Sequence, residues 1–301
     1  MSLNETLKYI PQKFRVPLTN VSEDIQELRL RINRPFGVTI LGQEKYLTKN
    51  GDLSQNPNDG LVCTKQDIYQ CFDFVCNHSV HSYAKELSQG YITIEGGNRV
   101  GLCGTYIYKN SEIHTIKDIS SINFRIANQV IGSAETLFKM MDFSSPKGLL
   151  LIGKPLSAKT TIIRDLSRLI SSRYKISIVD ERSEIASIYN GVPQNNVGIM
   201  TDVFNDYPKD IAIINAVRTM SPDIILCDEI GTLQDFKAIK RGGICGVKFI
   251  CTSHADSIAQ IMRNENFKDI LNTGAFDYIA LLGSGDNFGK IIDFKSINNG
   301  R

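Results

Sequence analysis

One segment of the sequence has the residue types of a phosphate-binding loop: positions 153–160 read GKPLSAKT. The general pattern is G-x-x-x-x-G-K-[ST], in which backbone N–H groups surround a phosphate, the lysine reaches the β- and γ-phosphate oxygens and the hydroxyl binds Mg²⁺. Gly153, Lys159 and Thr160 match this pattern, but Ala158 stands at the second glycine. Keeping a positive φ there costs an alanine on the order of 1 kcal/mol. The motif alone therefore leaves two interpretations open, a nucleotide loop and an ordinary helix start.

A second chemical signal lies in Ser221–Gly231, SPDIILCDEIG, where a short apolar run ends in two acids. In a parallel α/β sheet, acidic residues at the carboxyl end of a strand lie at the edge where ligands bind. Asp228 would then hold Mg²⁺ through water, and Glu229 would orient or deprotonate an attacking water. The competing interpretation is a pair of acids that only caps the next turn, and the upstream loop weighs against it.

Two further apolar runs also end in polar groups. ISIVDER places Asp180 and Glu181 after one run, and FICTSH places Thr252, Ser253 and His254 after another. One polar residue in such a position is more often an ordinary loop residue. Several strand ends of this kind in one half of the chain predict a shared site for phosphate, metal and proton chemistry.

The second half of the chain has the pattern of a parallel α/β sheet. Short apolar runs alternate there with helical patterns, which is typical of strands covered on both faces. The expected strands are 148–152, 176–179, 224–227, 247–252 and 278–282, the expected helices are 160–171, 208–220 and 232–241, and 290–294 closes a terminal hairpin.

The first half predicts a separate α+β domain. Thr64 and Asp67 predict the capped start of one helix, and a second helix is expected at 79–88. Strands are expected at 25–32, 37–41, 45–48, 91–94, 99–108 and 122–126. The boundary is expected near Asn128–Pro146, so we predict an α+β domain over 1–130 and an α/β domain over 131–301.

Composition narrows the class of protein. The chain has 301 residues, 42% hydrophobic and 22% charged, enough apolar content for a large core. Its 34 basic and 32 acidic residues give a net charge of +2, so nucleic acid is not an expected partner. The seven cysteines form no CxxC and predict free thiols. Without a signal peptide or a transmembrane run, we expect a soluble cytoplasmic protein that meets a membrane only through partners.

Six blocks in chain order carry a resemblance to a known family. They are ELRLRINRP (27–35), YITIEGGNRVGLCG (91–104), ISSINFRIA (119–127), VDERSEIA (179–186), RTMSPDIILCDEIG (218–231) and GVKFICTSHA (246–255). With these blocks the sequence resembles the stage III sporulation protein AA family. The resemblance implies a smaller N-terminal α+β domain followed by a RecA-like P-loop NTPase domain, as in the secretion ATPases.

The resemblance also implies a function and its residues. It implies an ATPase using ATP and Mg²⁺, acting as a hexameric ring in the mother-cell cytoplasm on membrane-embedded components of a sporulation channel. The implied nucleotide contacts are Gly153, Lys154, Pro155, Leu156, Ser157, Ala158, Lys159, Thr160 and Thr161. Thr160 and Asp228 are the implied metal ligands, Asp180 and Glu181 form the acidic box, and Glu229, Glu181, His254, Arg99 and Arg125 are the implied catalytic residues.

The phosphate loop departs from the family pattern, which usually reads close to GPPGCGKTT. Lys154, Leu156, Ser157 and Ala158 replace the expected residues and predict a stiffer loop, hence weak affinity and slow turnover. One alternative function is therefore a nucleotide-gated ring scaffold with little or no turnover. A motor acting on nucleic acid is a third hypothesis, and the near-zero net charge argues against it.

Overall fold

The computed structural model describes residues 2–109, 112–126 and 129–297, which form two compact units. The first unit contains the described part of residues 1–128 together with the short segment Tyr189–Gln194. The second contains Gln129–Ile188 and the chain from Asn195 onward. Asn128, where the expected linker begins, lies outside the described residues.

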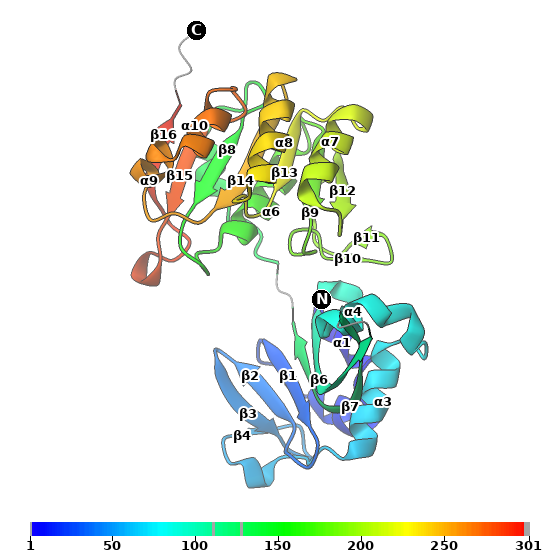
Figure 1. Ribbon diagram of the computed structural model, residues 1–301. Coiled ribbons are helices and arrows are strands. Elements are labelled where there is room, and N and C mark those ends of the chain that lie inside the picture. The colour runs from blue at the N-terminus through cyan, green and yellow to red at the C-terminus, as the bar shows by residue number, and fades with distance from the viewer. Residues whose placement is uncertain (1, 110–111, 127–128, 298–301) are drawn as a thin grey trace. The chain divides into compact units, whose positions relative to one another are not determined.

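The first unit is built on an antiparallel sheet with the strand order β4-β3-β2-β1-β7-β6-β5 (Figure 1). Its strands are β1 (Glu27–Arg31), β2 (Gly37–Ile40), β3 (Gln43–Leu47), β4 (Leu53–Ser54), β5 (Tyr91–Thr93), β6 (Arg99–Lys109) and β7 (Glu112–Arg125). Its helices are α1 (Ser2–Leu7), α2 (Gln12–Leu18), α3 (Lys65–Val75) and α4 (Ala84–Gln89), with 3₁₀ turns at Pro57–Asp59, Val80–Tyr83 and Glu95–Gly97.

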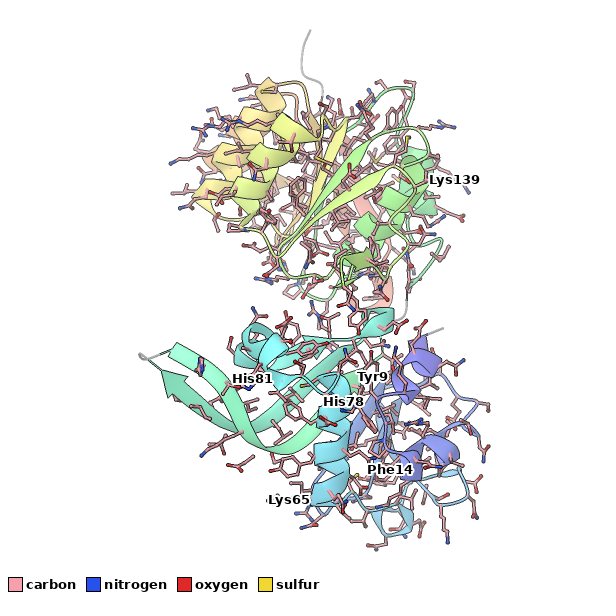
Figure 2. All side chains as sticks on the ribbon, turned by 90° about the vertical axis from the view of Figure 1, so that its right-hand side faces the viewer. Tyr9, Phe14, Lys65, His78, His81 and Lys139 are labelled. Carbon is pink, nitrogen blue, oxygen red and sulfur yellow. The ribbon has the colours of Figure 1, made fainter. Side chains whose placement is uncertain are left out.

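Alternation along the strands gives this sheet one buried face. In β1, Leu28 and Leu30 are fully buried, while the flanking charged residues are half-buried. Phe14 of α2 stacks on Phe36 with ring centroids 4.7 Å apart, and Figure 2 shows Phe14 inside this unit. The helix α3 begins as predicted, because Thr64 and Asp67 form a reciprocal capping box.

The second unit is the predicted α/β domain with a parallel-rich sheet of order β12-β9-β13-β14-β8-β15-β16 (Figure 1). Its strands are β8 (Leu149–Ile152), β9 (Ile176–Asp180), β12 (Thr201–Asn205), β13 (Ile224–Cys227), β14 (Lys248–Ser253), β15 (Tyr278–Leu282) and β16 (Ile291–Ser296). Only the β15–β16 pairing among these described strands is antiparallel.

Helices cover both faces of this sheet, as the continuous apolar strands require. They are α5 (Glu135–Met140), α6 (Lys159–Ile170), α7 (Lys209–Thr219), α8 (Leu233–Ile244), α9 (Ile258–Arg263) and α10 (Glu265–Leu271), with a 3₁₀ turn at Gly285–Asn287. Alternate strand residues pack into two cores: Leu150 and Ile152 lie with α7 to α10, and Leu149 and Leu151 lie with α5 and α6.

Several elements differ from the sequence-based expectation. The helix expected at 79–88 is a 3₁₀ turn followed by α4, and β7 extends well beyond the expected 122–126. The edge strand β12 has no continuous apolar run because it is only partly buried, so its pattern gave no signal. The two-residue strands β10 (Ile188–Tyr189) and β11 (Val192–Pro193) pair where no strand was expected.

Two further properties bear on the protein's class. All seven cysteines are free thiols. Across the described residues, no helix combines the length and the apolar character needed to cross a membrane.

Candidate functional site

Four adjacent strands of the second unit deliver the predicted polar residues to one edge of the sheet. In the order β9, β13, β14, β8, these strands end at Asp180, Cys227, Ser253 and Ile152. Because the strands are parallel and in register, Asp228 follows β13 next to Thr252 of β14, and the phosphate loop follows β8. Carboxyl ends of parallel strands form the ligand edge of such sheets, so the topology explains why these residues meet.

The phosphate loop (Gly153–Ala158) joins β8 to α6 through two left-handed residues. Leu156 has φ 59°, and Ala158 has φ 71° and ψ 18° as the residue that precedes the first turn of α6. Ala158 thus makes the turn for which glycine is usual, at a cost of about 1–2 kcal/mol. Gly153 lies close to its surroundings, since a Cβ there would meet Ser157 Oγ at 2.7 Å. Ser157 Oγ is buried without a hydrogen-bond partner among the described atoms.

Lys159, the first residue of α6, has its ammonium inside this loop. Its Nζ donates to the carbonyl oxygens of Gly153 at 2.9 Å and Lys154 at 2.8 Å, and lies 3.3 Å from His254 Nδ1. The side chain is 8% exposed. Burial lowers the pKa of Lys159, while the carboxylates of Asp228 and Glu229 act in the opposite direction. A buried ammonium held by neutral acceptors is suited to an incoming anion.

Asp228 is held by two hydroxyl groups from neighbouring elements. Thr160 Oγ1 donates to Asp228 Oδ2 at 2.9 Å, and Thr252 Oγ1 donates to Asp228 Oδ1 at 2.5 Å. Thr160 comes from the first turn of α6 and Thr252 from β14, where it is fully buried. These bonds fix the carboxylate directly beside the phosphate loop.

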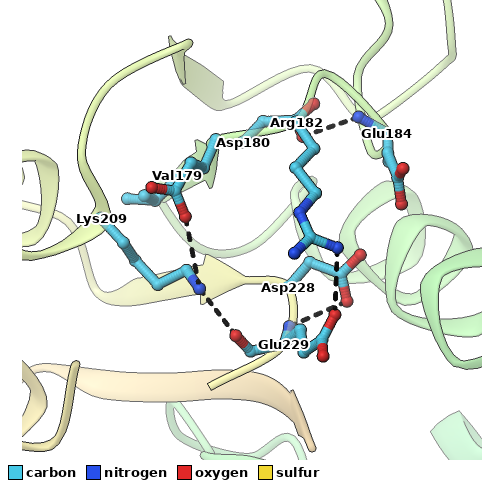
Figure 3. Close-up of a pocket in the computed structure, with 8 residues that line it drawn as sticks. Val179, Asp180, Arg182, Glu184, Lys209, Asp228 and Glu229 are labelled. Atoms are coloured by element: carbon cyan, nitrogen blue, oxygen red, sulfur yellow. Dashed lines mark hydrogen bonds and ion pairs between the residues drawn. The ribbon is translucent and has the colours of Figure 1, made fainter. Parts of the chain in front are cut away.

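Glu229 has a constrained backbone and a carboxylate with two basic side chains as neighbours. Its φ is 35°, a strained value for a residue with a Cβ, and its N–H donates to Thr252 Oγ1 at 2.8 Å. Glu229 Oε1 lies 3.3 Å from His254 Nε2, and Oε2 lies 3.3 Å from Arg182 Nη1. Figure 3 shows Arg182 reaching toward Glu229 across the pocket. The carboxylate is about 44% exposed, which leaves it accessible to water.

Asp180 and Glu181 lie side by side in sequence but have different surroundings. Asp180 is 1% exposed and accepts three backbone N–H groups. Burial raises its pKa, the three N–H bonds lower it, and the charge of Asp228 adds to the rise. Glu181 is half exposed and lies 3.7 Å from Lys209 Nζ. The two acids are therefore available to a ligand to different extents. The carboxylate of Asp180 is bound by backbone N–H groups, whereas Glu181 lines the pocket.

Two basic residues of the site were not predicted. Lys209 opens α7 and donates to the backbone oxygen of Glu229 at 2.7 Å. Arg164 lies on α6 and donates to the carbonyl oxygens of Ile185 at 2.7 Å and Glu184 at 2.5 Å. Lys209 follows Pro208 at an expected helix start, which was the one available signal for it. Arg164 looks like an ordinary helix residue in sequence.

The other implied catalytic residues, Arg99 and Arg125, belong to the first unit. They lie directly opposite each other on β6 and β7, and Arg125 is also the cross-strand partner of Glu27. Arg99 lies over the ring of Tyr91, with 5.1 Å from its guanidinium carbon to the ring centroid. The Arg125 Nε is 4.0 Å from Glu27, and its side chain is 69% exposed. The described residues that surround Lys159 and Glu229 in the contacts above all belong to the second unit.

The donor set fits Mg²⁺ and a polyphosphate. A hydroxyl and a carboxylate 2.9 Å apart, Thr160 and Asp228, are hard oxygen ligands of the kind Mg²⁺ takes. Within the described part of the chain, no cluster of three or more His, Cys, Asp or Glu side chains could hold a metal by itself. Mg²⁺ is usually held by one or two protein carboxylates and completes its shell with water and phosphate oxygens. The buried ammonium of Lys159 supplies the matching charge for phosphate.

Comparison with known proteins adds an independent line of evidence. A family model described as sporulation stage III, protein AA, matches residues 6–299. The chain is 36% identical over 285 residues to stage III sporulation protein AA of Bacillus subtilis (strain 168), covering 91% of this chain and 89% of that protein.

Two solved structures resemble the chain in fold. The pilus retraction motor PilT with bound ADP has a TM-score of 0.61 at 14% identity, covering 90% of this chain and 77% of that one. The ATPase DotB of Legionella pneumophila has a TM-score of 0.59 at 14% identity, covering 92% and 80%. The fold is therefore the predicted RecA-like α/β fold with a parallel-rich sheet, preceded by an α+β unit.

Proposed function

The chain belongs to the sporulation stage III protein AA family, and from that premise we propose that it binds ATP with Mg²⁺ and hydrolyses it. The observation that carries the proposal is the meeting of Lys159, Thr160, Asp228 and Glu229 at one sheet edge. These residues supply a phosphate-binding cation, two metal ligands and a base, which are the parts that phosphoryl transfer to water requires.

Each residue has a role that follows from its position. Backbone N–H groups of Gly153–Thr161 would surround the phosphates at the start of α6, and Lys159 would leave its carbonyl partners for the β- and γ-phosphate oxygens. Thr160 and Asp228 would hold Mg²⁺, which supplies neutralising charge to the phosphate oxygens when bound. Glu229 would orient the attacking water and accept its proton. His254 lies beside that carboxylate, and Glu181 is paired with Lys209 in the same site.

The backbone of Ala158 favours hydrolysis over a scaffold without turnover. The scaffold hypothesis rested on loss of the usual glycine, yet Ala158 takes the left-handed conformation that the glycine would supply. The cost of that conformation is modest, about 1–2 kcal/mol. The metal and base positions, Asp228 and Glu229, carry the residues that turnover requires.

The wider role in the cell is also a proposal. DotB and PilT are named as an ATPase and a pilus retraction motor, and both share this fold. We infer that the chain works as a hexameric ring at the mother-cell side of a secretion-like channel in endospore formation, bound to membrane-embedded partners. Arg99 and Arg125 would complete the nucleotide site of a neighbouring subunit.

The variant Lys159→Ala tests the proposal. It should lower the rate of ATP hydrolysis by at least about a hundredfold, as expected when one preorganised electrostatic contact to the transition state is lost. Lys139→Ala is the matched control, because Lys139 is an exposed lysine on α5 of the same unit (Figure 2). Phosphate release should be unchanged in that control. Hydrolysis by Lys159→Ala at the wild-type rate would show that the phosphate-loop assignment is wrong.

A further inference from the structure

We propose that Asp180 and Arg164 are positioning residues that fix the acidic loop (Glu181–Ala186) so that Glu181 and Arg182 face Glu229. This inference rests on the proposed ATPase function, because it concerns the same site. It differs from a metal-ligand role for Asp180, which is what an acid at this strand end would otherwise be expected to have.

Both oxygens of the Asp180 carboxylate accept hydrogen bonds from the backbone of the acidic loop. Its Oδ1 accepts the N–H of Glu184 at 2.8 Å, and its Oδ2 accepts those of Ile185 at 3.0 Å and Ala186 at 2.8 Å. Asp180 is the last residue of β9, and the side chain is 1% exposed. The loop is therefore wound around a buried carboxylate that is anchored in the sheet.

Arg164 holds the opposite side of the same peptides. Its Nε donates to Ile185 O at 2.7 Å and its Nη2 donates to Glu184 O at 2.5 Å. Asn195 Nδ2 donates to Ile185 O as well, at 2.9 Å. The Ile185 peptide is thus bound at both its N–H and its carbonyl oxygen. Because Arg164 lies one turn beyond Thr160 on α6, this clamp ties the acidic loop to the helix that begins at the phosphate loop.

The ion pairs that Arg182 and Glu181 make with Glu229 and Lys209 are too exposed to hold the acidic loop by themselves. Arg182 is 70% exposed in its pair with Glu229, and Glu181 is 48% exposed in its pair with Lys209. Exposed ion pairs contribute little to order. The hydrogen bonds of the buried Asp180 and the half-buried Arg164, together with that of Asn195, therefore fix the loop, and the exposed pairs then form because their partners are already in place.

The acidic loop affects the reaction through the contacts that it provides around Glu229. Arg182 contacts the Glu229 carboxylate (Figure 3). Lys209 donates to the backbone oxygen of Glu229 and lies 3.7 Å from Glu181. If the loop loosens, Glu229 loses these neighbours while Lys159, Thr160 and Asp228 keep theirs. The chemical step should then slow, whereas nucleotide binding at the phosphate loop should not change.

The test uses Asp180→Asn and Arg164→Lys in the full chain. Asparagine keeps the size of the side chain but loses one acceptor oxygen, and lysine keeps the charge but loses the two-pronged donor. Asp202→Asn and Arg173→Lys are matched controls, because both residues are exposed and outside the site. Three quantities are measured: Kd for ADP, kcat for ATP, and hydrogen exchange of the amides of Glu184, Ile185 and Ala186.

Both variants should lower kcat by about tenfold or more, leave Kd within about twofold and raise exchange at the three amides by about tenfold or more. Neither control should change any of these. Unchanged kcat with faster exchange would overturn the positioning role. For Asp180→Asn, a higher Mg²⁺ requirement with unchanged exchange would identify Asp180 as a metal ligand and also overturn it.

Two readouts separate this inference from the proposed function. Hydrogen exchange reports the state of the acidic loop whether or not the protein hydrolyses ATP. Absence of turnover in the wild type would therefore contradict only the ATPase proposal. Unchanged exchange in both variants would still contradict the positioning role of Asp180 and Arg164. If Asp180→Asn fails to fold, Arg164→Lys alone decides, since it retains the positive charge beside Asp180.

Discussion

Ala158 has φ 71° and stands at a position before the helix where phosphate loops usually have glycine. In the sequence, Ala158 departs from the phosphate-loop motif at the position of the second glycine. In the structure, Ala158 adopts the left-handed conformation that glycine would take there, and its Cβ makes this conformation strained. Lys159, Thr160, Asp228 and Glu229 could be predicted because each directly follows an apolar strand or a glycine-containing loop. Arg164 and Lys209 could not, because their partners are backbone oxygens of distant loops that no local pattern marks.

The strain at Ala158 predicts a gain in stability for Ala158→Gly. Relief of about 1–2 kcal/mol of strain is partly offset by about 0.5–1 kcal/mol of extra entropy in the unfolded chain. The net gain of about 0.5–1 kcal/mol should raise the Tm by about 1–3 °C in calorimetry. Ala84→Gly is the control, since Ala84 lies exposed in α4 with φ −58° and glycine there should lower the Tm. Equal losses in both variants would show that Ala158 is not strained.

Among the strands of the second unit's sheet, the sequence predicted those that carry the site and missed the edge strand β12. β8, β9, β13 and β14 are buried on both faces, so their apolar runs are continuous. β12 is a partly exposed edge strand and had no such run. The acidic loop was marked only by its acids, and its bonding to Asp180 and Arg164 depends on tertiary packing that sequence periodicity cannot reveal.

The segment Tyr189–Gln194 is another element that the sequence did not indicate. These residues follow the acidic loop in the chain but belong to the first compact unit. Within that unit, Gln194 Oε1 accepts the N–H of Gly96 at 2.8 Å and Asn77 Nδ2 donates to Tyr189 Oη at 3.3 Å. The sequence predicted one domain boundary, at residue 130, and did not indicate that this later segment groups with the first unit. The exact limits of the two domains stay a prediction.

At the scale of the whole molecule, the arginines of the first unit predict a shared nucleotide site. Arg99 and Arg125 face each other across two strands, and like charges in that arrangement repel unless an anion is near. Glu27 offsets part of this charge, at 4.0 Å from Arg125. We expect these arginines to reach a phosphate bound by another subunit, because an arginine supplied in trans can raise a phosphoryl-transfer rate by about 10³–10⁵.

Mixing of inactive subunits tests this shared site. Arg99→Ala and Arg125→Ala should each lose ATPase activity, and either should recover part of it when mixed with Glu229→Gln subunits. Arg34→Ala, an exposed arginine of the same unit, should remain active without mixing. No recovery in either mixture would count against a site built from two subunits. Full activity of Arg99→Ala and Arg125→Ala by themselves would remove both residues from the mechanism.

The most direct measurement of the central claim is phosphate release from ATP as a function of protein concentration, for the wild type and Glu229→Gln, with Mg²⁺ and with a chelator. We expect Mg²⁺-dependent turnover whose specific activity rises with protein concentration. Glu229→Gln should bind ADP as the wild type does and hydrolyse ATP about 10²–10⁴-fold more slowly, because the base at the sheet edge is removed. Turnover that is unaffected by the chelator and equal in the wild type and Glu229→Gln would show that this site does not hydrolyse ATP.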